Sequence, residues 1–280
     1  MKSTLSLLVQ FLMCFALCGC NDGSYEDAVK ASEKGDYSTA QKLLLPLAEK
    51  GDVRAQCSLG DMYFTARGVK QDFKESAYWY RKAAEQGKAS AQYDLGFILF
   101  YQSKGVPQDF KQASDWFRKA ADQGYADAQE ELGKMYTYGH GVPQDDKEAA
   151  KWFRKAADQG NSSAQIYLGD MYINGKGVPQ DFKEAANWYR KDAQNSGWDG
   201  LRKLGHLHAN GQGVDQDIVL AYVFFVLSDD ESTSVLRKKL SRAQIEEANA
   251  LVETLVAAGS GEIRAPLPTQ SRTGRKHIVN

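Results

Sequence analysis

The sequence predicts an all-α fold built as a solenoid. The first observation is a phrase, GVPQDFK, that occurs at 105–111 and again at 177–183, with near-copies at 68–74, 141–147 and 213–219. The second is its regular spacing. Aligned on the motif AQxxLG, the copies step by 36, 37, 36 and 36 residues through Ala55, Ala91, Ala128, Ala164 and, in a degenerate fifth copy, Gly200. The third is that no segment has a convincing strand pattern. A period of this length is typical of stacked two-helix units.

Each copy predicts two helices joined by a turn. The first helix places Ala55, Leu59 and Met62 on one face, and it ends at a glycine-containing turn. The phrase then supplies a proline that cannot continue this helix and an aspartate that can cap the next one. A Glu or Gln three residues later predicts a reciprocal capping box in four copies, at Asp72/Glu75, Asp109/Gln112, Asp145/Glu148 and Asp181/Glu184. The second helix carries the core tryptophans Trp79, Trp116, Trp152 and Trp188, which stand in register ahead of small alanines.

The two ends of the array depart from this pattern. Residues 25–34 and 35–52 predict a divergent leading helix pair. The last second helix, 218–227, is apolar on every side and must therefore be covered. The segment 241–258 predicts the cover: a C-terminal capping helix with Ser241 as N-cap and one apolar face, formed by Ile245, Ala248, Val252 and Leu255.

The first twenty residues predict an export signal. Residues 1–19 have one lysine and an apolar run that is too short to span a membrane. The letters LCGC at 17–20 resemble the bacterial lipoprotein signal, which implies that Cys20 becomes the first mature residue and carries lipid. The alternative is an ordinary cleaved signal that happens to contain cysteine. Asn21 follows where an aspartate would favour the inner membrane, so the periplasmic face of the outer membrane is expected.

Composition gives no sign of nucleic-acid binding or of catalysis. The 35 basic and 36 acidic residues nearly cancel, whereas nucleic-acid binding usually shows a basic surplus. Cys57 is the only cysteine in the body of the chain, so no disulfide framework is expected there and an inert thiol is the default. His206 and His208 stand two apart on one helix and cannot share a metal as an i, i+4 pair would. We therefore expect no catalytic residue, no metal and no cofactor.

The repeated letters also carry a family resemblance. The pattern AQxxLGxMYxxGxGVPQDxxxAxxWxRKAAxxG resembles the Sel-one-like repeat (SLR), a relative of the tetratricopeptide repeat, closely over 52–195 and loosely over 196–230. The resemblance implies a right-handed α-solenoid that binds other proteins, often in the bacterial envelope. The organisation expected is a signal peptide (1–19), a lipidated cysteine with tether and leading pair (20–51), an SLR array (52–231), capping helices (232–258) and a disordered basic tail (259–280).

The candidate binding residues are those that the repeat does not need. First helices of such arrays generally line the concave face. There, the positions equivalent to 57, 61 and 64 vary freely among copies, and we call them the A stripe. Tyr93, Phe97 and Phe100 form an aromatic row on it, next to Tyr101, and core filling by these rings is the competing interpretation. The further candidates on this face are Asp61, Lys134, Ile166 and Asp170.

The function expected is therefore a lipid-anchored, non-catalytic module that binds a protein or peptide of the envelope on its concave face. An immunity role, in which the protein neutralises a secreted antibacterial effector such as a phospholipase, is nested within this expectation, because some SLR lipoproteins with that role resemble this chain. The rival class is an enzyme of cell-wall or β-lactam chemistry, for which no nucleophile–base pair is visible.

Overall fold

A computed structural model describes residues 24–101, 103–195 and 197–256, and these ranges contain helices and no strand. The chain divides into two compact units, residues 1–109 and 110–280, and the boundary falls inside the second copy of the repeat. The expected signal peptide, Cys20 and the basic tail lie outside the described residues. The all-α prediction is confirmed.

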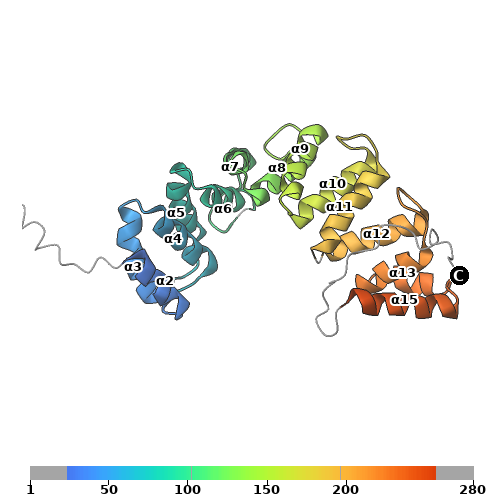
Figure 1. Ribbon diagram of the computed structural model, residues 1–280. Coiled ribbons are helices and arrows are strands. Elements are labelled where there is room, and N and C mark those ends of the chain that lie inside the picture. Colours follow the sequence, from blue (N-terminus) through green and yellow to red (C-terminus); the bar gives the residue numbers. More distant parts are fainter. Residues whose placement is uncertain (1–23, 102, 196, 257–280) are drawn as a thin grey trace, which may run out of the picture. The chain divides into compact units, whose positions relative to one another are not determined.

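In the first unit, helices that follow one another in sequence pack against one another (Figure 1). They are α2 (Tyr25–Glu33), α3 (Tyr37–Glu49), α4 (Val53–Thr65), α5 (Phe73–Glu85) and α6 (Ala89–Phe100). Leu44 of α3, Leu59 of α4 and Trp79 of α5 meet in one core cluster. The pair α2–α3 therefore covers the apolar side of α4 that would otherwise open the array to water.

The second unit continues the same stacking and then closes it. Its helices are α7 (Phe110–Asp122), α8 (Ala126–Tyr138), α9 (Asp146–Asp158), α10 (Ser162–Asn174), α11 (Phe182–Gln194), α12 (Trp198–Asn210), α13 (Ile218–Leu227), α14 (Ser232–Arg237) and α15 (Arg242–Leu255). Helix α13 is buried almost all round, and α12, α14 and α15 pack against it. Ser241 caps α15 in a full capping box, and Ala248 and Leu255 face the core, as the sequence predicts.

The repeated phrase closes each turn with its glutamine and its aspartate. The aspartate accepts hydrogen bonds from the first backbone N–H groups of the second helix, as Asp145 does from Lys147 and Glu148 at 2.9 and 3.1 Å. The glutamine amide donates to a carbonyl at the end of the first helix, as Gln144 does to Thr137 at 3.0 Å. All five copies make this second bond, through Gln71, Gln108, Gln144, Gln180 and Gln216. The phrase thus ends one helix and starts the next.

The prediction of reciprocal capping boxes is wrong at three of the four aspartates, Asp72, Asp145 and Asp181. The aspartate half forms at Asp72, Asp145 and Asp181, but no glutamate reaches back to the N-cap N–H. That N–H is already used: in these three copies it donates to the carbonyl of a tyrosine on the preceding helix, at 3.0–3.1 Å. Because the turn itself satisfies the donor, the glutamates remain at the surface.

The AQ and LG letters join neighbouring helices. The buried glutamine donates to a carbonyl at the end of the preceding second helix, as Gln165 does to Ala157 at 3.1 Å, and Gln56, Gln92 and Gln129 repeat the bond. The glycine lies against an aromatic ring of the second helix. A Cβ on Gly169 would come within 2.3 Å of the Tyr189 ring, and one on Gly133 within 2.8 Å of the Phe153 ring. Glycine is therefore required by the close approach of two helices.

Candidate functional site

The aromatic row lies on α6 beside the core of the first unit. Leu95, Ile98 and Leu99 are buried, as predicted, whereas Phe97 is half-buried. The Phe97 ring meets the Phe64 ring of α4 edge-on, with centroids 6.2 Å apart, and the Tyr101 ring at 4.4 Å. The rings therefore pack on one another across two first helices, and the idea that the row is surplus to packing is too strong.

Tyr101, next to the aromatic row, is more accessible than the three members of the row. Its side chain is 49% exposed, while Tyr93, Phe97 and Phe100 are each half-buried. Partly exposed aromatic rings are a residue type that is enriched among interface anchors. The rings of this cluster thus share local packing and remain partly accessible at the surface.

The two A-stripe aspartates are held by tyrosine hydroxyls of the second helix in their own copy. Tyr80 donates to Asp61 at 2.5 Å, and Tyr189 donates to Asp170 at 2.6 Å. In unit 2, Lys203 of α12 also reaches Asp170, with its Nζ 2.5 Å from the Oδ1 atom. The carboxylates are thus parts of side-chain networks between helices.

Lys134 and Ile166 lie in the second unit. The Lys134 ammonium is 2.6 Å from Glu130 and 2.9 Å from Glu131, and both pairs are half-buried or buried. Burial raises the pKa of Glu131, while Lys134 opposes that shift. Ile166 packs against the apolar C-terminal core. The predicted face therefore falls into two parts, one in each unit, and only the part in unit 1 gathers aromatic rings.

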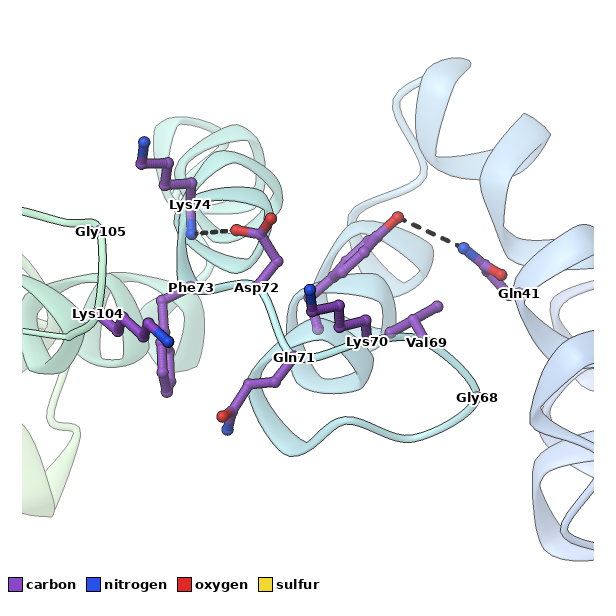
Figure 2. A pocket seen from close by; sticks show the side chains of 11 residues that line it. Gln41, Gly68, Val69, Lys70, Gln71, Asp72, Phe73, Lys74, Lys104 and Gly105 are labelled. Carbon is purple, nitrogen blue, oxygen red and sulfur yellow. Dashed lines mark hydrogen bonds between the residues drawn. The ribbon is translucent and has the colours of Figure 1, made fainter.

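Sequence reasoning missed a basic pocket in the first unit. Figure 2 shows this cavity of about 850 Å³, lined by Gln41, Tyr63, the turn 68–74 and Lys104–Gly105. Lys70, Lys74 and Lys104 are exposed and make no ion pair with the described residues. Lys70 stands where three other copies have proline, and this departure from the phrase was the available signal.

The titratable groups of the described ranges do not form a reactive constellation. Burial, with the nearby Asp61, raises the pKa of Cys57 to about 11, so the thiol stays protonated at neutral pH. Burial lowers the pKa of His208, whose Nδ1 lies 3.1 Å from the carbonyl oxygen of Asp215. Across the described part of the chain, no group of three His, Cys, Asp or Glu side chains could hold a metal ion. None of the helices described here has the length and apolar character needed to cross a membrane.

Stacked helix pairs of this kind define an α-solenoid, an architecture of the protein-interaction class. The chain belongs to the Sel1 repeat family, the SLR of the sequence analysis: the family model matches residues 53–88, 89–125, 126–161, 162–195 and 198–227, more than half of its length. No curated protein matches the sequence.

Solved structures of other Sel1 repeat proteins resemble the fold. A Sel1 repeat protein from Oxalobacter formigenes is 25% identical, with a TM-score of 0.72 over 82% of this chain and 99% of that chain. The protective antigen c5321 of uropathogenic Escherichia coli, which has an SLR fold, is 28% identical, with a TM-score of 0.51 over 83% of this chain and 61% of that chain. The immunity protein Pa5087 of Pseudomonas aeruginosa is 22% identical, with a TM-score of 0.44 over 74% of this chain and 81% of that chain.

Proposed function

We propose that this protein is a lipid-anchored, non-catalytic module that holds a protein or peptide partner at the bacterial envelope, with the aromatic row of α6 as its anchor. The observation that carries the proposal is the exposed Tyr101 ring, which packs against the aromatic row. Tyr101 exposes half of its surface while Phe97 and Phe64 keep the neighbouring rings in place. Family membership supports a protein partner, since Sel1 repeats are generally interaction scaffolds.

The partner site is tested by a matched pair of tyrosines. Tyr138 of α8 stands at the position of Tyr101 in the next copy, and its side chain is 58% exposed. Tyr101→Ala should weaken partner binding by about 2 kcal/mol or more, as for an interface anchor, with little change in stability. Tyr138→Ala is the control and should leave binding nearly unchanged. Equal binding by the wild type and Tyr101→Ala would place the site elsewhere on the array.

Phe97→Asp is not a suitable test of the site, although the position carries aspartate in two other copies. Aspartate occupies this position at Asp61 and Asp170, but each of those carboxylates accepts a tyrosine hydroxyl. The residue at the matching position in the second copy is Phe117, which has no hydroxyl to donate. A carboxylate at 97 would lack that partner, so a loss of binding could reflect a loss of fold.

The lipid anchor is tested by a substitution at Cys20. Cys20→Ser should move the protein out of the membrane fraction, and globomycin should make the unprocessed precursor accumulate. Four residues, 21–24, separate Cys20 from α2, and at about 3.5 Å per residue they reach under about 20 Å. The array would therefore sit against the membrane. Processing that is unaffected by globomycin would refute the lipoprotein proposal.

The partner decides between two roles. Affinity capture of the lipidated protein from envelope extract should recover one protein whose recovery Tyr101→Ala abolishes. An envelope-assembly protein would support a scaffold, and a secreted antibacterial effector such as a phospholipase would support an immunity role. A toxin gene beside this one would favour the second role. Turnover of nitrocefin or peptidoglycan by the purified protein would instead overturn the non-catalytic proposal.

A further inference from the structure

Both units contain a carboxylate that accepts a tyrosine hydroxyl, but the third residue beside that carboxylate differs between them. In unit 2, Asp170 of α10 accepts the Tyr189 hydroxyl and, at 2.5 Å, the ammonium of Lys203 on the next first helix. In unit 1, Asp61 of α4 accepts the Tyr80 hydroxyl in the same way. The position of Lys203 is taken there by Asp94 of α6, because both residues stand three after the start of the AQ motif or its equivalent.

Unit 1 therefore has two carboxylates where unit 2 has a carboxylate and an ammonium. Neither Asp61 nor Asp94 makes an ion pair with any described residue. Arg67 acts on Asp61 without forming an ion pair with it, and Lys88 acts on the neighbouring Cys57 thiol. Asp61 is exposed and Asp94 is half-buried. Two carboxylates that form no ion pair attract a cation.

Burial, and secondarily the Asp61 carboxylate, raises the pKa of Asp94 to about 7. The Asp61 carboxylate contributes to this shift, because a nearby like charge favours the protonated form. In unit 2, the Lys203 ammonium supplies the counter-charge for Asp170. Lys203 therefore shows, within this chain, which type of side chain neutralises a carboxylate at this position.

The acidic pair lies one helical turn from the aromatic contact. Phe64 follows Asp61 by three residues on α4, Phe97 follows Asp94 by three residues on α6, and the two rings meet with centroids 6.2 Å apart. An acidic end and an aromatic end therefore share one surface of two neighbouring helices. Such a surface matches a cationic side chain next to an apolar one, and aromatic rings add attraction for the cation.

We propose that Asp61, Asp94 and Tyr80 bind a lysine or arginine side chain of the partner, while Phe64 and Phe97 receive an apolar residue beside it. This inference rests on the proposed function, since it gives the chemistry of the partner at the same face. The ammonium takes the place that Lys203 occupies in unit 2.

The test uses a positional-scanning library of acetylated, amidated hexapeptides, presented to the full-length protein in detergent. Peptides with lysine or arginine next to an aromatic or large aliphatic residue should be enriched at least about tenfold, the factor that a difference of 1.4 kcal/mol gives. No enrichment of a cationic residue overturns the proposal. The selected peptide should also lose at least about tenfold in affinity for Asp94→Lys, in which the chain supplies its own ammonium as it does at Lys203.

Glu85→Lys is the matched control, because it makes the same change in charge at an exposed position of α5 in the same unit. It should bind the selected peptide nearly as the wild type does. Asp61→Asn removes one carboxylate with a small change in shape and covers the case in which Asp94→Lys does not fold. Equal binding by the wild type, Asp94→Lys and Asp61→Asn overturns the cationic site.

The two proposals fail separately. If the envelope partner is lost with Tyr101→Ala but retained by Asp94→Lys and Asp61→Asn, the binding face stands and the cationic site is wrong. If the peptides behave as expected but Tyr101→Ala retains the envelope partner, the cationic site stands and the proposed anchor is wrong.

Discussion

Asn195→Gln should stabilise the protein by completing a chain of glutamine hydrogen bonds. In unit 1, Gln86 donates to the side-chain oxygen of Gln56 at 2.8 Å; in unit 2, Gln159 does the same for Gln129 at 2.8 Å. Each pair is 30 residues apart, and the matching donor for Gln165 is Asn195, which is one methylene shorter. Accordingly, the buried Oε1 atom of Gln165 has no hydrogen-bond partner among the described residues.

The magnitude follows from the missing bond. An intramolecular hydrogen bond contributes about 0.5–1.5 kcal/mol, and a buried acceptor left without one costs about 1–3 kcal/mol. The longer side chain loses somewhat more rotamer freedom on folding, which offsets part of the gain. We therefore expect Asn195→Gln to raise the free energy of unfolding by about 1 kcal/mol, or the melting temperature by about 2–4 °C for a chain of this size.

The assay is urea unfolding with circular dichroism, and the control is the reverse change. Gln159→Asn should leave the Gln129 oxygen without its donor and lower the free energy of unfolding by about 1–3 kcal/mol. Both variants should shift the midpoint and keep the slope with denaturant, which shows that stability and not compactness has changed. If neither variant moves the midpoint, the glutamine chain contributes nothing and the reasoning is refuted.

Three further predictions concern a tryptophan, a turn and a carboxyl group. Trp152→Ala should lower the free energy of unfolding by about 3–5 kcal/mol, and a loss below about 1 kcal/mol would show that this 6% exposed ring is not core. Ala66→Gly should raise it by about 0.5–1 kcal/mol in thermal melts, because Ala66 has a left-handed φ of 60° where three other copies have glycine; a loss would refute the strain. The folded state raises the pKa of Asp94 from 3.8 to about 7, so the folded protein binds more protons than the unfolded protein in this range. The free energy of unfolding of the wild type should therefore fall as the pH rises from about 4 to 7. Asp94→Asn should remove at most about 4 kcal/mol of this fall, whereas parallel pH profiles of the two proteins would contradict it.

The sequence was sufficient for the repeat and for the two helices in each copy. Fixed spacing places equivalent residues in equivalent environments, so one reading of the phrase holds for all copies. Local rules also transferred where they involve neighbours in sequence, as with the Asp145 cap on the helix that follows it.

The sequence was insufficient where a bond depends on how the turn closes. The phrase glutamine reaches back seven or eight residues to the first helix, as Gln144 does to Thr137, and this reach exists only after the turn has formed. The same closure brings the Asp145 N–H to the Tyr136 carbonyl and removes the need for a reciprocal capping box. Local pattern rules do not contain that competition.

The candidate site was predicted in part. Helical spacing predicts one face for Tyr93, Phe97 and Phe100, but it could not show that the Phe64 ring would meet the Phe97 ring. The sequence does contain a pattern that predicts the hydrogen bonds between aspartate and tyrosine. Copies with aspartate on the A stripe, at 61 and 170, have tyrosine 19 residues later, whereas the copies with lysine at 134 and histidine at 206 have phenylalanine there.

The tryptophans give the molecule an optical reporter in each of the five matched repeats. Each of the five matched repeats contains one of the five tryptophans, at 79, 116, 152, 188 and 198. Trp79, Trp152 and Trp188 are buried, while Trp198 is 53% exposed at the start of α12. Variants that keep a single tryptophan should therefore report by fluorescence on one repeat at a time: the buried rings shift to longer wavelength when their own repeat opens, and Trp198 is already open to a dissolved quencher in the folded protein.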